Sequence, residues 1–260
     1  MRPHDDSNGL PSACVNVFFR FTENLDDRDI DAALASLSVE EREKYRRFVF
    51  RKDRRDFAAA HALLRCALST RKAVLPSSWT FTEAPRGKPM LSRDQMNCCF
   101  NLSHTTGLVV CGLSETAEIG IDAESINRGM DFEEIASSNF SQSEVQALTK
   151  LPAEQRRTRF TELWTLKEAY LKATGAGLSD PLSDVAFEMK GDSSLRFAAS
   201  AGTAIGSWQF LLFAPSESYR VAVAVRHIGK IAYEMSEWRD GFCNSSLKPI
   251  RTTFDDAVEQ

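Results

Sequence analysis

The feature that most constrains the fold is an order of segments that occurs twice along the 260 residues of the chain. Ser38 to Glu41 and Ser141 to Glu144 both read S-x-x-E, a capping box that favours the start of a helix. A longer stretch with apolar residues at helical spacing follows each box, over residues 48–68 and 160–173. Short apolar stretches that are typical of strands come next in both halves. The pattern predicts two lobes built on one plan.

A second observation points the same way. His61 and Arg65 are four residues apart, as are Glu168 and Lys172 in the second half. An internal duplication explains this, and chance similarity is the alternative. We predict an α+β fold of two similar, pseudo-symmetric lobes, each with helices and a small, mainly antiparallel sheet. The site is expected in the cleft between them, a favoured place for a ligand. Strands are expected over residues 15–21, 79–81, 100–103, 108–113, 119–122, 185–189, 195–198, 207–213 and 220–225.

The expected organisation is an N-terminal tail over residues 1–14, a first lobe over 15–122, a second lobe over 123–228 and a polar C-terminal tail over 229–260. The net charge of −4 argues against a nucleic-acid binder. The six cysteines include no C-x-x-C pair, which argues against a structural zinc site. The first residues lack the apolar segment of a signal peptide, and no apolar run is long enough to span a membrane. We expect a cytoplasmic monomer that binds neither membranes nor nucleic acid.

The strongest local motif is Trp164-Thr165-Leu166-Lys167-Glu168-Ala169-Tyr170-Leu171-Lys172. Glu168 and Lys172 lie one helical turn apart on the same face. Such a pair is usually a solvated surface ion pair of little energetic consequence. Here the neighbouring Trp164 and Tyr170 leave the helix little polar face, which favours a pair that lines a cleft.

A second motif is Gly120-Ile121-Asp122-Ala123-Glu124. In a strand, Asp122 and Glu124 point to the same side and repel each other unless a cation lies between them. Carboxylates together with substrate phosphates are the ligands that Mg²⁺ prefers. Together with Glu168, these residues would supply three carboxylates to a metal ion that bridges a pyrophosphate. The alternative is a strand that runs into a solvated acidic loop.

A third group of residues suits phosphate binding. Arg86, Lys88, Ser103 and His104 could all bind phosphate oxygens. A lone histidine such as His104 is more often a structural turn residue. The basic run from Lys44 to Arg55 is usually a solvated helix face, but it could also hold the phosphates of a nucleotide.

Taken in this order, the motifs resemble those of the two-lobed, surfactin-synthetase-activating type of 4′-phosphopantetheinyl transferase. The resemblance covers roughly residues 15–228. A further stretch, from Phe48 to Asp53, looks like the family's segment at the start of the first-half helix. The matching segments are Gly87-Lys88-Pro89, Phe100-Asn101-Leu102-Ser103-His104, Gly120-Ile121-Asp122 and Trp164-x-x-Lys167-Glu168-x-x-x-Lys172.

The resemblance implies an enzyme that uses Mg²⁺. It would transfer the 4′-phosphopantetheine arm of coenzyme A to a serine of an apo acyl, peptidyl or polyketide carrier protein and release 3′,5′-ADP. One departure is Glu83, where some relatives have a basic residue near the adenine. The implied roles are metal ligands for Asp122, Glu124 and Glu168; proton acceptor, directly or through water, for Glu168; pyrophosphate contact for Lys172; coenzyme A contacts for Lys44, Arg86, Lys88, Ser103 and His104, with Lys44 at the 3′-phosphate; and a place near the metal for Glu144.

Three other functions compete with this one. A non-catalytic module that binds coenzyme A or a carrier protein could keep the same fold, but it should have lost one of the acids or Lys172. A metal-dependent phosphohydrolase would release ADP without a carrier. A nucleic-acid module is suggested only by the basic first-half helix. Because carrier proteins of the family are generally acidic, we expect them to dock on the basic segment from Lys150 to Arg159; the alternative is that this segment is only a solvated loop.

Overall fold

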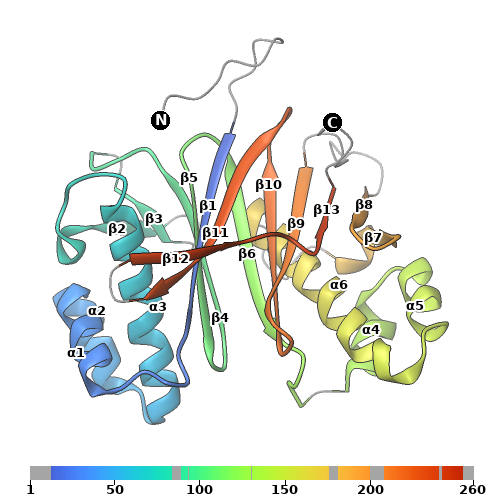
Figure 1. Cartoon of the computed structure of the whole chain (residues 1–260), viewed down its shortest axis with the longest axis horizontal. Coiled ribbons are helices and arrows are strands. Elements are labelled where there is room, and N and C mark those ends of the chain that lie inside the picture. Colours follow the sequence, from blue (N-terminus) through green and yellow to red (C-terminus); the bar gives the residue numbers. More distant parts are fainter. Residues whose placement is uncertain are drawn as a thin grey trace.

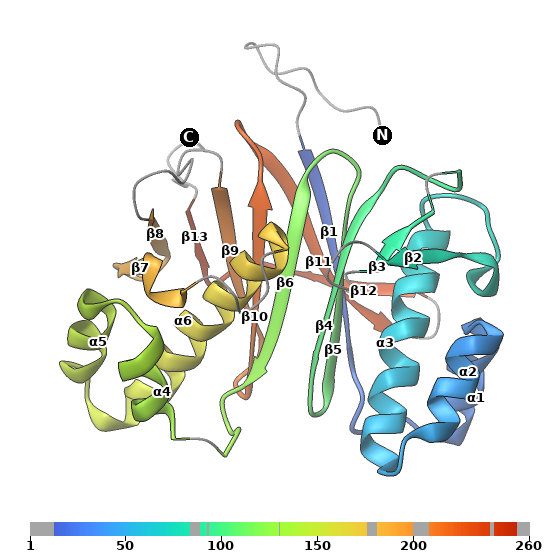
Figure 2. The same cartoon turned by 180° about the vertical axis from the view of Figure 1, so that it is seen from behind.

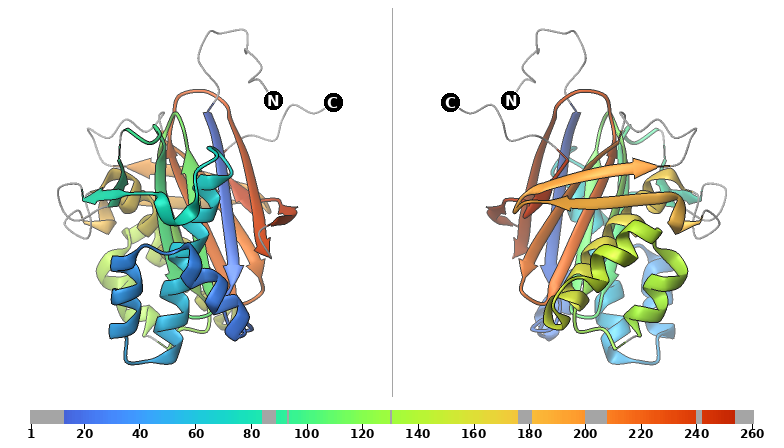
Figure 3. Two further views of the ribbon diagram at one scale, coloured as in Figure 1. Left: turned by 90° about the vertical axis from the view of Figure 1, so that its left-hand side faces the viewer. Right: turned by 90° about the vertical axis from the view of Figure 1, so that its right-hand side faces the viewer.

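Two sheets lie back to back in the centre of the molecule, and the helices of each lobe cover the outer face of one sheet (Figures 1 and 2). The computed structural model describes residues 13–83, 89–92, 94–129, 131–175, 181–199, 208–239 and 242–253. Views from the two ends of the molecule show the helices of each lobe outermost (Figure 3). The predicted α+β fold with two lobes is therefore confirmed.

The first lobe is built on a five-stranded sheet with the order β12-β11-β1-β5-β4. The long helix α3 packs on it through a cluster of buried residues that includes Leu64, Leu68, Trp79 and Phe100. The elements are β1 (Ala13–Phe21), α1 (Asp27–Ser36), α2 (Val39–Arg47), α3 (Arg51–Ser69), η1 (Pro76–Ser78), β2 (Phe81–Glu83), β3 (Pro89–Leu91), β4 (Cys99–Thr105), β5 (Leu108–Ser114), β11 (Ile231–Arg239) and β12 (Phe242–Leu247).

The second lobe is built on a six-stranded sheet with the order β6-β10-β9-β13-β8-β7. Helix α6 packs on its outer face, where Leu166, Tyr170 and Phe210 belong to one buried cluster. Gly175 ends this helix in the left-handed region at φ 69°, as expected. The elements are β6 (Glu118–Ser125), α4 (Phe132–Asn139), α5 (Gln142–Thr149), α6 (Ala153–Thr174), η4 (Leu182–Asp184), β7 (Val185–Lys190), β8 (Ser194–Ala199), β9 (Trp208–Ser216), β10 (Tyr219–Arg226) and β13 (Arg251–Thr252).

The inner faces of the two sheets share a third buried cluster, to which Val17 and Val110 contribute from the first sheet and Ile121 and Val223 from the second. Strands β4 and β6 meet at the edges of their sheets through side chains. Asn101 accepts a hydrogen bond from the Ile121 amide at 2.8 Å, and Ser103 accepts one from the Ala123 amide at 3.1 Å. The two lobes are therefore joined directly beside the candidate site.

The segment after residue 228 contains strands, although its polarity suggested a tail without regular structure. Strand β11 pairs in parallel with β1, and β13 lies between β9 and β8 in the other sheet. Ile231, Met235 and Trp238 are buried, although most of their neighbours in the sequence are polar. The low average hydrophobicity of the segment therefore conceals the apolar residues that form the strand. Strand β6 belongs entirely to the second sheet. We therefore propose a boundary between the lobes before residue 118 and a first lobe that includes residues 231–247.

The internal duplication is visible in two equivalent ion pairs. In the first lobe, the capping-box residue Glu41 contacts Arg65 at 2.7 Å, and Arg65 donates to the carbonyl oxygens at the two ends of η1. In the second lobe, Glu144 contacts Lys167 at 2.8 Å, and Lys167 donates to the carbonyl oxygens at the two ends of η4. Arg65 is thus the counterpart of Lys167. The expected equivalence of Arg65 with Lys172 was wrong.

Within the described ranges, no helix combines the length and the apolar character that a membrane crossing requires.

Candidate active site

The position of α6 against β6 depends on Gly120. A β-carbon at this residue would lie 2.1 Å from the Ala169 carbonyl oxygen and 2.3 Å from the Ala173 amide nitrogen, which are backbone atoms of α6. Because only glycine leaves room for them, the helix can pack directly on the strand. This contact brings Lys172 of the helix to Asp122 of the strand.

The centre of the candidate site is a hydrogen-bonded triangle. The ammonium of Lys172 lies 2.7 Å from Oδ1 of Asp122 and donates to Oγ of Ser103 at 2.9 Å. The Ser103 hydroxyl in turn donates to the same Asp122 oxygen at 3.0 Å. The other carboxylate oxygen of Asp122 is buried and has no hydrogen-bond partner among the described residues. This buried carboxylate oxygen is therefore available to a ligand.

Two more carboxylates border the same pocket. The pKa of Glu168 is raised by burial and by the negative charge of Asp122, against the opposing effect of Lys172. The pKa of Glu124 is raised by burial and by Asp122, although Arg128 pairs with Glu124 at 2.9 Å. The pocket holds about 440 Å³ and is lined by Leu102, Ser103, His104, Asp122, Ala123, Glu124, Arg128, Trp164, Glu168 and Lys172.

The donor set suits a hard cation such as Mg²⁺, because one Asp122 oxygen has no partner in the described part of the chain and the neighbouring acids repel one another. No three acidic, histidine or cysteine side chains in the described part of the chain already surround one point as metal ligands would. The Asp122 carboxylate is paired with the Lys172 ammonium at 2.7 Å. The residues present fit the ion by their chemistry.

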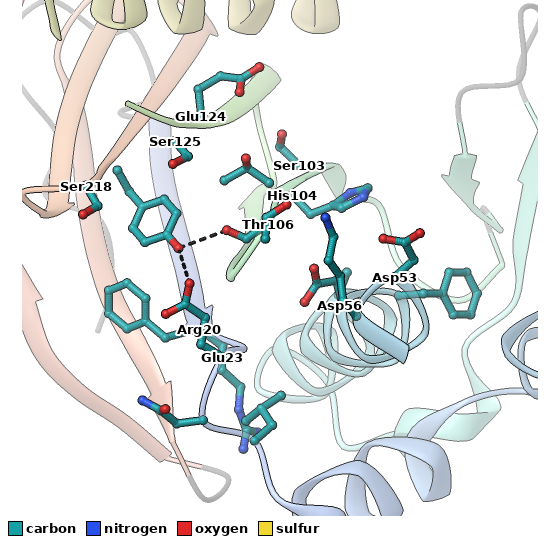
Figure 4. A pocket seen from close by; sticks show the side chains of 18 of the residues that line it. Arg20, Glu23, Asp53, Asp56, Ser103, His104, Thr106, Glu124, Ser125 and Ser218 are labelled. Atoms are coloured by element: carbon teal, nitrogen blue, oxygen red, sulfur yellow. Dashed lines mark hydrogen bonds between the residues drawn. The ribbon is translucent and has the colours of Figure 1, made fainter. Parts of the chain in front are cut away.

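A larger cleft of about 1420 Å³ lies between the lobes, next to this pocket. Figure 4 shows Ser103, His104 and Glu124 on one side of it and Asp53 and Asp56 of α3 on the other. Its charged lining mixes basic and acidic side chains: the basic ones are Arg20, Lys44, Lys52, Arg128 and Arg239, the acidic ones are Glu23, Asp29, Asp53, Asp56, Glu124 and Glu237, and His61 and His104 also line it. A cleft of this size, with several basic side chains, can hold an extended ligand with phosphates.

A hydrogen-bonded contact spans the two lobes at the edge of this cleft. The Tyr219 hydroxyl donates to Glu23 and lies 3.0 Å from the Thr106 carbonyl oxygen (Figure 4). Burial and the nearby charge of Glu23 raise the pKa of Tyr219 to about 12, so the hydroxyl keeps its proton. Gly107 adopts φ 88°, and a β-carbon there would lie 2.3 Å from the Tyr219 oxygen.

The structure brings most of the predicted residues together. Asp122, Glu124, Glu168, Lys172, Ser103 and His104 line the smaller pocket. Lys44 lines the larger cleft, with its ammonium 5.4 Å from the centre of the Phe57 ring. Arg86 and Lys88 lie outside the described residues.

Glu144 differs from its expected place near the metal. It lines neither the pocket nor the cleft. Its buried carboxylate pairs with Lys167 and accepts a hydrogen bond from the Phe187 amide at 2.9 Å. Two of its contacts join α5 to α6 and β7 and two others belong to the capping box at Ser141, so the carboxylate is engaged in holding the second lobe together. Its place in the capping box of α5 was visible in the sequence, but its ion pair was not.

The basic segment from Lys150 to Arg159, whose arginines lie in the first two turns of α6, is also less free than expected. Arg156 donates to the Thr149 and Leu151 carbonyl oxygens, and Arg159 pairs with Glu162 at 3.0 Å. Arg157 lies over the Phe132 ring and donates to the Arg128 carbonyl oxygen. These contacts hold the arginines against the second lobe, although bonds to carbonyl oxygens leave the charge of Arg156 and Arg157 in place, and docking on this segment stays a prediction.

Sequence reasoning missed Arg128 and the structural role of Asn101. Arg128 pairs with Glu124 and lines both the pocket and the cleft. The spacing of four residues between the two was the one signal that could have identified it. Asn101 accepts a backbone hydrogen bond from β6, a role that no single-sequence pattern predicts.

Comparisons with known proteins cover both lobes. A profile described as 4′-phosphopantetheinyl transferase superfamily matches residues 118–224, and one described as 4′-phosphopantetheinyl transferase, N-terminal, matches residues 25–116. The 4′-phosphopantetheinyl transferase HetI of Nostoc sp. is 34% identical over 75% of this chain and 81% of its own length. A 4′-phosphopantetheinyl transferase of Bacillus subtilis is 30% identical over 76% of this chain and 85% of its own. The mouse L-aminoadipate-semialdehyde dehydrogenase-phosphopantetheinyl transferase is 25% identical over 87% of this chain and 79% of its own length.

Proposed function

Because this chain belongs to the 4′-phosphopantetheinyl transferase superfamily, we propose that it moves the phosphopantetheine arm of coenzyme A to a serine of an apo carrier protein. The products are the modified carrier and 3′,5′-ADP. The observation that carries the proposal is the triangle of Lys172, Asp122 and Ser103 beside Glu168, next to a cleft whose lining includes several basic side chains.

Binding of coenzyme A is assigned to the cleft. Lys44, on the first lobe, is the proposed ligand of a terminal phosphate such as the 3′-phosphate; the support is that it lines the cleft, and His104 lines both the cleft and the pocket. Ser103 lies beside Lys172, where the pyrophosphate would be held. Arg86 and Lys88 remain proposed phosphate ligands from the sequence. Two lobes that each supply contacts would fix the reacting phosphorus in one position, and positioning is a large part of phosphoryl transfer.

Mg²⁺ is the proposed metal, held by Asp122, Glu124 and Glu168. The support is the buried Asp122 oxygen without a partner, together with the raised pKa values of Glu124 and Glu168. When bound, the ion would neutralise charge on the pyrophosphate as the bond to the leaving group breaks. Lys172 would then turn from Asp122 to the pyrophosphate, where a cation also stabilises the leaving 3′,5′-ADP.

The chemical step needs a proton acceptor for the serine. The serine oxygen attacks the β-phosphorus, a new P–O bond forms, and the bond from that phosphorus to the oxygen of 3′,5′-ADP breaks. Glu168 is the proposed acceptor of the hydroxyl proton, directly or through water. Its raised pKa makes it a stronger base than an ordinary carboxylate once it is ionised.

Glu144 is assigned a structural role instead of a catalytic one, because its ion pair with Lys167 belongs to the second-lobe core. No observation on the described residues favours the non-catalytic alternative. The cytoplasmic location and the monomeric state stay predictions from the sequence.

The assay that tests the proposal follows 3′,5′-ADP release from coenzyme A with Mg²⁺, in the presence and absence of an apo carrier domain. Release that requires the carrier, and stops when its acceptor serine is replaced by alanine, is expected. Equal release without a carrier would indicate a phosphohydrolase.

A further inference from the structure

The corner between α2 and α3 exposes two neighbouring apolar side chains. Val49 is 85% exposed and Phe50 is 69% exposed, which makes them two of the three most exposed large apolar side chains in the described part of the chain. Single exposed apolar residues are ordinary on a protein surface, but an adjacent pair at a corner is a typical contact point for a partner.

Exposed cations surround this pair. Arg46, Arg47 and Arg51 are all exposed, and residues 44–52 contain no acid. Among the described residues, the ion pair that involves these three joins Arg51 to Asp27, with both side chains more than 90% exposed, so water screens it. A strongly positive surface in a chain of net charge −4 attracts an acidic partner. We call Arg46, Arg47, Val49, Phe50 and Arg51 the corner patch.

The corner patch is held rigidly. Phe48 packs against Phe57 of α3 with ring centres 5.0 Å apart, and Arg54 donates to the Phe48 carbonyl oxygen at 2.7 Å. The backbone is extended at Phe48 and Phe50, where α2 ends and α3 begins. The half-buried Phe48, packed between two helices, leaves Val49 and Phe50 outside in a defined orientation. A rigid apolar contact loses less conformational entropy on binding than a flexible one.

The corner patch also borders the cleft. Phe48 and Lys52, on either side of Val49, Phe50 and Arg51, line the cleft itself. A partner bound at the patch is therefore held beside the opening into which it must deliver its reacting group. A membrane surface could also bind basic and apolar side chains, but it has no reason to lie at the mouth of this cleft.

We propose that the corner patch docks the carrier protein, through an acidic surface with an apolar depression that receives Val49 and Phe50. This inference rests on the proposed function, since it assigns a docking surface to the carrier of that reaction. The patch replaces the segment Lys150 to Arg159, whose arginines are engaged within the second lobe.

The test uses the full chain and an apo carrier domain of acidic net charge. Two double variants change the patch, Val49→Ser/Phe50→Ser and Arg47→Glu/Arg51→Glu. The Kd for the carrier is measured by calorimetry, and steady-state transfer gives KM for the carrier and for coenzyme A. We expect Kd and KM for the carrier to rise about tenfold in each variant, because central contacts dominate such interfaces. The KM for coenzyme A should not change in Val49→Ser/Phe50→Ser, and the charge variant should show a flatter salt dependence of carrier binding.

Matched controls lie elsewhere on the surface. Leu75→Ser changes another exposed apolar side chain, which is 72% exposed. Lys190→Glu/Arg196→Glu makes the same change in net charge on β7 and β8 of the second lobe. Both controls should bind the carrier as the wild type does. Unchanged melting temperatures would show that the patch variants fold normally.

Wild-type affinity for the carrier in both patch variants overturns the inference. A second result would also overturn it: the variants lose binding to phosphatidylglycerol vesicles while their kinetics with the carrier stay unchanged. The corner patch would then bind a membrane surface and not the carrier. If the wild type binds the carrier without modifying it, the proposed function fails, and the carrier Kd of the variants still decides the docking surface.

Discussion

Lys172 of α6 lies 2.7 Å from Asp122 of β6, and both contact Ser103 of β4. Three segments that are separate in the sequence thus meet at one point between the lobes. Gly120 makes this possible because it lets the helix lie directly on the strand. The glycine and the aspartate of the motif Gly120-Ile121-Asp122 therefore have different roles. Gly120 allows α6 to pack closely on β6, and Asp122 forms an ion pair with Lys172 of that helix.

Replacing Gly120 with alanine should disturb the site and the fold together. The new methyl group would collide with backbone atoms of α6 at 2.1 and 2.3 Å, and backbone cannot move aside as a side chain can. We expect a loss of about 1–3 kcal/mol in unfolding free energy and a transfer rate at least tenfold lower. Thermal unfolding and transfer kinetics measure both. Gly129→Ala is the control for stability, because a methyl group at Gly129 meets no atom within 4 Å.

Glu144→Gln should destabilise the protein without removing its chemistry. The variant leaves the buried Lys167 ammonium without its negative partner, which typically costs about 3–5 kcal/mol. The melting temperature should fall, while kcat per folded molecule stays within about threefold of the wild type, as a group outside the site requires. The pair of substitutions Glu144→Leu/Lys167→Met should recover part of the stability. A large loss of kcat in a Glu144→Gln enzyme that is folded would indicate that Glu144 has a catalytic role.

Acid stability should depend on Glu41. Burial alone would raise its pKa, but hydrogen bonds from His61 and Arg65 outweigh burial and lower the pKa to about 2. A carboxylate whose folded pKa is depressed stabilises the fold above its unfolded pKa of 4.5, and this contribution disappears as the pH falls through 2. Between these values, the unfolding free energy of the wild type should fall more steeply with decreasing pH than that of Glu41→Gln. Urea unfolding at several pH values measures the difference, and parallel curves would contradict the assignment.

His104→Ala should act mainly on coenzyme A. The side chain lines both the pocket and the cleft, so it is placed to contact phosphate groups. We expect KM for coenzyme A to rise about tenfold and kcat to change by less than about threefold. His227→Ala is the matched histidine control, since His227 does not line the cleft. If KM rises only for the carrier, His104 belongs to a different surface.

Much of the fold followed from local patterns. The two capping boxes start α2 and α5 as predicted, and Gly175 ends α6. These features depend on neighbouring residues, so one sequence is enough to find them. Strand β11 was missed because its buried residues Met235 and Trp238 are spaced irregularly among polar ones, and its partner β1 lies at the other end of the chain.

The sequence predicted which acidic residues line the site better than it predicted the tertiary contacts of those residues. Asp122, Glu168 and Lys172 stand in motifs with recognisable spacing, and the structure places them in one pocket. Glu144 stands in a motif of the same kind, but a tertiary contact with Lys167 removes it from the site. Spacing along the chain cannot distinguish an acid that faces a cleft from one that faces a buried lysine.

The most direct measurement of the central claim is the mass of an apo carrier protein after incubation with this enzyme, Mg²⁺ and coenzyme A. The wild type should add one phosphopantetheine group to each carrier. Asp122→Asn and Glu168→Gln should slow this gain by at least about 100-fold, because each removes a charge needed for the metal or for the proton. Glu118→Gln, an exposed acid on the same strand, should leave the rate unchanged. Absence of any gain across acyl, peptidyl and polyketide carriers, or equal rates in all variants, would contradict the account.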